Sequence, residues 1–388
     1  MKLFRYYYLC KDVFASITDL EYSSAMDLYE RVKEQNLAPR TNNLSYIEAR
    51  LLTEKRIKEE FLKKGGVAER DHPYYLTLER CDNWFFDAKN CFGALAIDLD
   101  EFDLSTLSFT YGDSIPTFMD TFDDGRPYRK NVYTYEEIKS VIKKHGFPQK
   151  WNTYGEKGPE NYIEVQVWSD SVINKFRPVS ENFIENIVGA TIKASSKIDD
   201  KVACQKGLKY YLDFVKKSPY YAWFIKKLKS INKDVFFDSP VHGASHSLKS
   251  AFLSFVLATI KGYDEIKAKA SVFTGLYHDI GRSDDGYNLT HGQIGSEIVE
   301  KYIDFPFDKK EIEKIKEAIC HHTDNKKINN EYLINLRDVD SLDYMRLGFS
   351  RYDPSHLKTK EAKELIRCTM ELNIQLYLNP GFLSKLEE

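Results

Sequence analysis

The sequence predicts an α+β N-terminal domain followed by an all-α helical bundle. The chain has 388 residues, and at roughly 150 residues per domain this length suggests two or three domains. Its composition, 42% hydrophobic and 30% charged, is globular and excludes collagen-like, low-complexity and disordered chains. Near Pro178 the pattern changes from mixed strands and helices to helices alone. We therefore expect an α+β domain over 1–178, a linker or bridging helix over 179–205, and a helical domain over 206–388.

The first domain combines two helical segments with four strands. Apolar residues at helical spacing, among many Glu, Lys and Leu residues, predict helices over Ser23–Gln35 and Tyr46–Lys64. Alternating or continuous apolar runs, separated by loops rich in Asp, Gly and Pro, predict the strands. These strands are His72–Thr77, Phe92–Asp98, Ser105–Tyr111 and Tyr162–Trp168.

The second half contains helical patterns divided by clear loop residues. The first predicted helix, Lys206–Ile231, carries a Lys-rich face that is typical of a solvated surface. The loops between the later helices contain Asp, Asn and Pro. These later helices are predicted over Ala244–Lys261, Asp264–Tyr277, His291–Ile303, Lys309–His321, Glu331–Leu347 and Lys360–Leu376.

Charge and cysteine usage narrow the class of protein. The net charge is −3, from 56 basic and 59 acidic residues, so we see no clear nucleic-acid-binding signature and no need for a membrane surface. The six cysteines form no C-x-x-C pair, which favours reduced thiols. The N-terminus resembles no signal peptide, and the longest apolar stretch, Ala251–Ile260, is too short to span a bilayer. We expect a cytoplasmic protein without a membrane partner; its oligomeric state stays open.

Histidines concentrate in the helical half. Six of the nine fall between residues 242 and 322, mostly at the ends of predicted helices. Imidazole and carboxylate groups suit zinc, iron or manganese, and facing helices of a bundle build inward-facing metal sites. Hydrogen-bonded core histidines and helix caps would explain any one of these residues, but they explain the whole set poorly. The clustered histidines are His242, His246, His278, His291, His321 and His322.

The order His246, then His278-Asp279, then Asp340 resembles the H…HD…D signature of the HD-domain phosphohydrolase superfamily. His278-Asp279-Ile280-Gly281-Arg282 resembles its HD-x-G-[KR] motif, and Val339-Asp340-Ser341-Leu342-Asp343 resembles its closing A-D-x-L-D motif. The resemblance covers about residues 235–350. It implies that the helical domain is an HD-type bundle in which His246, His278, Asp279 and Asp340 bind a divalent metal.

A second metal is implied by the longer order H…HD…H…HH…D of the HD-GYP group and related hydrolases. By this resemblance Asp279 bridges two ions, iron or manganese in preference to zinc, and the second ion takes His291, His321 and His322. Adjacent helical residues diverge by about 100°, so His321 and His322 converge only if their helix frays. No G-Y-P run follows the HD pair, so the cyclic-di-GMP specificity of the HD-GYP group does not carry over.

The resemblance implies an enzyme that cleaves a phosphate ester or anhydride bond of a nucleotide or nucleotide-derived signal by a metal-activated hydroxide. Asp279 is the central catalytic carboxylate, and Arg282 and Lys249 are candidate phosphate contacts. Arg282 could equally be a surface charge at a helix end. His242 is a candidate general acid, and Asp284, Asp285 or Asp343 could orient ligand histidines. A nucleotide-sensing module with a metal site and little turnover is the alternative.

The first domain carries a different resemblance. Tyr74-Tyr75-Leu76-Thr77 and the later Tyr162-Ile163-Glu164-Val165-Gln166 resemble the strands of ADP-ribosyltransferase-like domains, which handle NAD. A further alternative is therefore a two-activity protein, in which the first domain also modifies a target using NAD and Glu164 is required for that activity. The competing interpretation places Glu164 on the polar face of an alternating strand. A sensing or substrate-gating role is the more general expectation for this domain.

Overall fold

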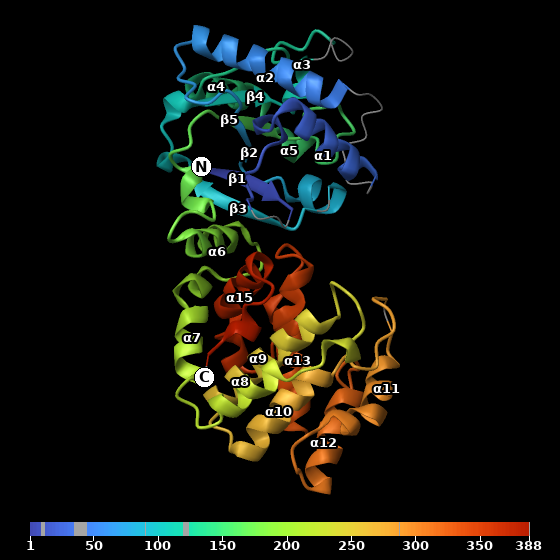
Figure 1. Cartoon of the computed structure of the whole chain (residues 1–388). Coiled ribbons are helices and arrows are strands. Elements are labelled where there is room, and N and C mark those ends of the chain that lie inside the picture. Colours follow the sequence, from blue (N-terminus) through green and yellow to red (C-terminus); the bar gives the residue numbers. More distant parts are fainter. Residues whose placement is uncertain (9–11, 35–44, 90, 119–123, 287, 388) are drawn as a thin grey trace. The chain divides into compact units, whose positions relative to one another are not determined.

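The structure is a computed structural model that describes residues 1–8, 12–34, 45–89, 91–118, 124–286 and 288–387. It contains two compact units, Met1–Ala194 and Ser195–Glu388 (Figure 1). The first unit is α+β and the second is all-helical, which confirms the predicted fold class. The boundary differs from the expected one, because helix α6 (Phe183–Ala194) packs on strand β3 of the first unit. Residues 179–194 therefore belong to the first unit instead of a linker.

A five-stranded sheet forms the centre of the first unit. The strand order is β3-β1-β2-β5-β4, and every neighbouring pair is antiparallel. The four predicted strands are present, and sequence reasoning missed the first strand because its aromatic run follows directly on the chain start. The strands are β1 (Lys2–Tyr7), β2 (Tyr74–Leu78), β3 (Gly93–Asp98), β4 (Leu107–Tyr111) and β5 (Ile163–Val167).

Strand β5 is buried along its whole length. It lies between β2 and β4 in the sheet, and all five of its residues, Glu164 and Gln166 included, are buried. Glu164 and Gln166 do alternate with apolar residues along this strand, as one of the two interpretations expected, but both faces of the strand are buried. Alternation of apolar and polar residues indicates two different faces, but it does not reveal that both faces are covered.

Six helices accompany this sheet in the described part of the first unit. The two predicted helices are present, and the segment Tyr135–His145 was missed. Its sequence does carry a start signal, because Thr134 and Glu137 form a reciprocal capping box. Gly146 follows its last residue at a positive φ. The helices are α1 (Tyr22–Glu34), α2 (Ser45–Lys63), α3 (Ser114–Phe118), α4 (Tyr135–His145), α5 (Pro148–Trp151) and α6.

The second unit is built around α9, whose residues from His246 to Ala258 are all buried. This helix packs against α10 and α13. The predicted helix Lys206–Ile231 is two helices, because the chain turns at Pro219, which has no N–H to donate. The predicted helix over Lys360–Leu376 is likewise divided. The helices are α7 (Leu208–Val215), α8 (Tyr221–Lys229), α9 (Ala244–Ile260), α10 (Glu265–Tyr277), α11 (His291–Ile298), α12 (Lys309–Cys320), α13 (Glu331–Asp343), α14 (Lys360–Lys363) and α15 (Ile366–Leu378).

Among the described helices, none combines the length and the apolar character that crossing a bilayer requires.

Candidate metal centre

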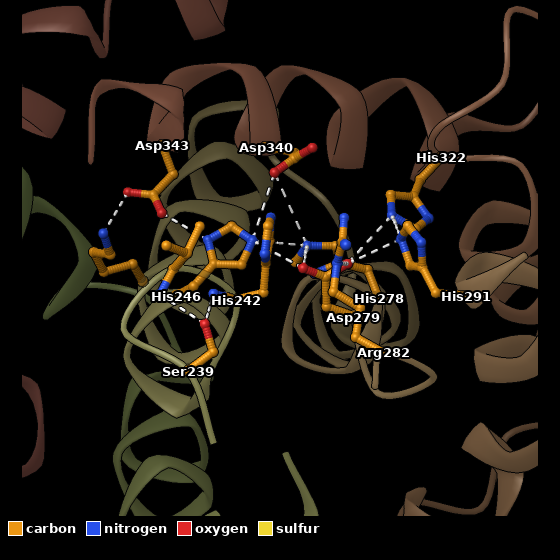
Figure 2. Close-up of polar contacts among 12 residues, drawn as sticks. Ser239, His242, His246, His278, Asp279, Arg282, His291, His322, Asp340 and Asp343 are labelled. Carbon is orange, nitrogen blue, oxygen red and sulfur yellow. Dashed lines mark hydrogen bonds and ion pairs between the residues drawn. The ribbon is translucent and has the colours of Figure 1, made fainter. Parts of the chain in front are cut away.

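The predicted ligands come from the ends and inner faces of five helices in the second unit. His246 lies in the first turn of α9, and His278 is the C-cap of α10, with Asp279 next to it. His291 opens α11, His322 follows the end of α12, and Asp340 lies on α13. Figure 2 shows their side chains converging on one region. All are buried except Asp340, whose side chain is 39% exposed.

Two glycines allow these helix ends to approach one another. A Cβ on Gly281 would lie 2.2 Å from the carbonyl oxygen of His291, so only glycine lets the turn after Asp279 contact the start of α11. A Cβ on Gly292 would lie 2.8 Å from the carbonyl oxygen of Ile319. The start of α11 therefore packs directly on the last turn of α12, and this brings His291 to His322.

Asp279 lies between two pairs of histidines. Its Oδ2 atom is 3.5 Å from Nε2 of His246 and 3.6 Å from Nε2 of His278. Its Oδ1 atom is 3.1 Å from Nε2 of His291 and 3.6 Å from Nε2 of His322 (Figure 2). Each carboxylate oxygen thus faces its own pair of imidazole rings.

Asp340 joins the first of these pairs. Its Oδ1 atom is 3.5 Å from Nε2 of His246 and 4.0 Å from Nε2 of His278. Two groups of possible ligand atoms, each within 4.8 Å, follow from these distances. One contains His246, His278 and Asp340, and the other contains His278, Asp279 and His322.

In each histidine ring, the contact made by Nδ1 determines that Nε2 is the nitrogen free to bind a metal. Nδ1 of His246 contacts a carboxylate oxygen of Asp343 at 2.7 Å. In His278, His291 and His322, Nδ1 contacts the backbone carbonyl oxygen three residues earlier, at 2.5–2.9 Å. These oxygens only accept hydrogen bonds, so each Nδ1 must carry the hydrogen. In the neutral ring Nε2 then keeps its lone pair.

The distances between these lone pairs fit a metal better than a hydrogen bond. Nε2 of His246 and Nε2 of His278 are 3.0 Å apart, and the same distance separates Nε2 of His291 from Nε2 of His322. Two unprotonated nitrogens this close repel each other unless a cation lies between them. Nitrogen ligands about 2.1 Å from one ion at adjacent positions lie about 3 Å apart. The residues therefore fit a divalent metal.

The charge states of His278 and Asp279 suit metal binding at neutral pH, whereas the carboxylates of Asp279 and Asp340 outweigh burial and raise the pKa of His322. Burial lowers the pKa of His278 to about 4, with the neighbouring rings of His246 and His322 acting in the same direction. Burial alone would raise the pKa of Asp279, but the surrounding imidazoles outweigh it and hold that pKa well below its usual value. His278 is therefore neutral and Asp279 ionised, which are the forms that bind metals.

Lys249 lies behind the ligands instead of facing them. Its Nζ atom is 2.8 Å from Oδ1 of Asp343 and donates to Oδ1 of Asn373 at 2.8 Å. Asp343 in turn holds Nδ1 of His246. Lys249, predicted as a phosphate contact, is thus engaged in orienting a carboxylate that orients a ligand histidine. Asp343 has the orienting role predicted for it.

His321 does not join the cluster of ligand atoms. Helix α12 ends at Cys320, and Nδ1 of His321 contacts Asp324 at 2.6 Å. Two adjacent residues at this helix end point in different directions, as the helical geometry predicts. Of these two adjacent histidines, only His322 lies close to Asp279.

Arg282 is largely covered and lies against the site, so it is no surface charge. Its side chain is 10% exposed, and Nε lies 3.1 Å from Oδ1 of Asp279. His242 belongs to a neighbouring cluster, in which its Nδ1 and the Ser239 hydroxyl both contact Oδ1 of Asp285, at 2.8 and 2.5 Å. Asp285 therefore orients His242 and not a ligand histidine, and Asp284 is exposed and accepts from a nearby backbone N–H.

The comparisons with known proteins agree with this arrangement. Residues 243–346 match the HD domain family model, so the helical unit contains an HD domain. HD domains bind divalent metals and are generally hydrolytic, so this match suggests a metal-dependent phosphohydrolase.

Two curated relatives are similar to about a third of the chain. Ribonuclease Y of Mycoplasma genitalium is 34% identical over 131 residues, which is 34% of this chain and 24% of the relative. Ribonuclease Y of Mycoplasma pneumoniae is 32% identical over 132 residues, 33% of this chain and 24% of the relative. The chain thus spans about a quarter of the length of these relatives. No solved structure matches significantly.

The residues singled out in the first unit also lie together. Tyr75, Tyr162 and Glu164 line one cavity between the sheet and helix α2. The resemblance of this unit to ADP-ribosyltransferase-like domains stays a prediction.

Proposed function

We propose that the helical unit hydrolyses a phosphate ester or anhydride bond of a nucleotide or nucleotide-derived molecule, with two divalent ions, iron or manganese in preference to zinc. The single observation that carries the proposal is the position of Asp279. Its two oxygens face two separate pairs of histidines, and each pair presents bare Nε2 atoms. This arrangement supports a carboxylate that bridges two ions.

The proposed ligands divide between the two ions in an unequal way. His246, His278 and Asp340 would hold the first ion with Oδ2 of Asp279. His291 and His322 would hold the second ion with Oδ1 of Asp279, and the position of His321 argues against a third histidine there. When bound, such ions polarise a phosphoryl oxygen and supply a nucleophile at neutral pH.

The protein side chains then orient the substrate and the ligands. Asp340 is the exposed member of the cluster, so the substrate approaches from its side. The Arg282 guanidinium is held by Asp279 through Nε and by the Gly286 carbonyl through one terminal nitrogen. Within the described residues its other terminal nitrogen has no hydrogen-bond partner, so it can donate to a phosphate oxygen. Lys249 and Asp343 act as positioning residues that fix the ring of His246.

The substrate class rests on the family and on the relatives. Because both relatives are named ribonucleases, a phosphodiester in a short RNA belongs among the candidate substrates together with mononucleotides, dinucleotides and cyclic nucleotides. A test should therefore offer all of these to the full chain loaded with Mn²⁺ or Fe²⁺, and detect released phosphate or nucleoside monophosphate.

Three variants make this test decisive. His278→Ala and Asp279→Ala should each lower turnover by at least a hundredfold, because each removes a ligand of the cluster. Asp284→Asn is the matched control: it lies five residues after Asp279, is exposed, and contacts only a backbone N–H within the described residues, so turnover should not change. If no substrate is cleaved by the metal-loaded protein, the hydrolase proposal is refuted. Tight nucleotide binding without cleavage would select the sensing alternative.

A further inference from the structure

A cavity of about 240 Å³ lies in the first unit, between the inner face of the sheet and helix α2. Strands β1, β2 and β5 form its floor, and α2 and the short 3-10 helix Ile17–Asp19 lie against it. The volume equals that of about eight water molecules at roughly 30 Å³ each. It is therefore large enough for one planar ring system with substituents and smaller than most sites for drug-sized ligands.

Glu164 contributes a prepared carboxylate to this cavity. It is 3% exposed, and a chain of buried hydrogen bonds leads to it. The Trp168 indole donates to Ser108 at 2.9 Å, and Ser108 donates to Oε1 of Gln166 at 2.8 Å. The Gln166 amide then donates to Oε1 of Glu164 at 2.9 Å. Because every donor in this chain points toward Glu164, its carboxylate is fixed in position as an acceptor.

Arg50 contributes a cation from the opposite wall. Its guanidinium lies 4.4 Å from the ring centre of Tyr75 and 5.9 Å from that of Tyr46, and it donates one hydrogen bond to Ser114. Within the described part of the chain, no ion pair shorter than 4.0 Å links Arg50 to Glu164 or to Glu54. A guanidinium has five N–H groups, so most of its donors stay available to a molecule in the cavity.

Several other polar groups of the cavity are already hydrogen-bonded within the fold. The Tyr75 hydroxyl donates to Glu54 at 2.8 Å, and the Tyr162 hydroxyl donates to Asp113 at 3.1 Å. Glu54 also accepts from Thr18 and contacts His72. Aromatic rings supply the remaining wall.

Three of these rings lie together. Tyr6 and Phe85 are stacked at 4.3 Å between ring centres, and Tyr162 lies 5.2 Å from Phe85. The cavity thus presents to a ligand one carboxylate, one guanidinium and a set of flat aromatic surfaces. This combination fits a flat molecule that both donates and accepts hydrogen bonds.

We infer that this cavity is a binding site for a small planar heteroaromatic ring that carries an amide edge, as in a lactam nucleobase or an aromatic carboxamide. The ring packs against the aromatic wall, its carbonyl oxygen accepts from Arg50, and its N–H donates to Glu164. The inference goes beyond the hydrolase of the helical unit and does not depend on it.

The experiment measures binding to the full chain by calorimetry and by saturation-transfer NMR. Probes with an amide edge are inosine, guanosine, uridine and nicotinamide; adenosine, which has no carbonyl group on its ring, is the matched negative probe. None of these probes carries a phosphate, and the protein is treated with a chelator. Failure of this test and failure of the hydrolase proposal are therefore separate results.

We expect at least one amide-edge probe to bind with a Kd below 1 mM and at least tenfold more tightly than adenosine. Glu164→Gln and Arg50→Met should each weaken that binding at least tenfold, because Gln cannot supply a charged acceptor and Met supplies no donor. Glu101→Gln is the control; this exposed carboxylate pairs with Lys175 outside the cavity and should not change binding. Unfolding curves of the variants verify that each is folded.

Two results overturn the inference. One is that no amide-edge probe binds below 1 mM, which leaves the cavity to water. The other is that folded Glu164→Gln and Arg50→Met both bind the probes as the unchanged chain does.

Discussion

Glu164 should make the stability of the first unit depend on pH in a predictable direction. The pKa of Glu164 is raised from 4.5 to about 7: burial is the largest cause, the nearby Asp113 acts in the same direction, and Arg50 opposes both. The folded chain therefore holds the Glu164 proton at pH values where the unfolded chain has lost it. Stability must then fall as the pH rises from about 4.5 to about 7, and stay at the lower value above that.

The size of the effect follows from the two pKa values. The difference between 7 and 4.5, at 1.36 kcal/mol per pH unit, is on the order of 3 kcal/mol. Because Glu164 is 3% exposed, little of this is lost to solvent screening. Glu164→Gln removes the charge and keeps an oxygen that accepts from Gln166. At pH 8 the variant should therefore be more stable than the unchanged chain by up to about 3 kcal/mol, and at pH 4.5 the two should differ little.

Urea unfolding followed by tryptophan fluorescence measures this, since Trp84, Trp151 and Trp168 all lie in the first unit. Free energies of unfolding are compared at intervals from pH 4.5 to pH 8. Glu101→Gln serves as the control and should show the pH dependence of the unchanged chain. The stability advantage of Glu164→Gln could instead stay constant or shrink as the pH rises. That result would show that the fold stabilises the charged Glu164 carboxylate, and it would refute the predicted pH dependence.

Three further predictions concern the helical unit. Asp343→Asn should lower metal affinity and turnover by about ten- to a hundredfold, because His246 loses the carboxylate that fixes its ring; metal titration and kinetics measure both, and unchanged affinity would contradict the positioning role. His322→Ala should reduce the bound metal from two ions to one, as counted by elemental analysis, while Thr323→Ala next to it should keep both. Gly281→Ala should destabilise the unit by more than about 1 kcal/mol and lower its metal content, because a Cβ there meets a backbone oxygen at 2.2 Å; a thermal unfolding curve that does not change would refute the close-packing argument.

The gathering of these histidine and aspartate residues could be predicted because they lie in short local motifs; that they bind metal stays a prediction. Adjacent His278 and Asp279, with His246 before them and Asp340 after them, lie at helix ends whose positions the sequence predicts well. The orientation of each side chain could not be predicted in the same way. Whether Lys249 faces the ligands or the back of the cluster depends on helix rotation, and only the packing of α9 against α13 decides it. The sequence also does not reveal that His321 contacts Asp324.

The first unit was less predictable for a related reason. Its polar residues belong to strands, where alternation identifies two faces without identifying what covers them. The sequence therefore shows Glu164 and Gln166 only as the polar face of an alternating strand, although together with Ser108 they form a buried hydrogen-bonded chain. The cavity itself combines residues from β1, α2, β2 and β5 that are up to 160 residues apart, and no local pattern brings them together.

The two units contain buried carboxylates whose surroundings differ in a way that bears on function. Asp279 is enclosed by imidazoles that keep its pKa well below the usual value, so its ionised form is the stable one in the fold. Glu164 has a pKa raised to about 7 despite the presence of Arg50. An uncompensated buried charge is destabilising, and replacing it by glutamine would preserve the hydrogen bond from Gln166. A fold that keeps a carboxylate at this position, fixed by a chain of donors and open to a cavity, retains a hydrogen-bond acceptor that the fold itself does not need. A ligand with N–H groups is the partner that such an acceptor fits.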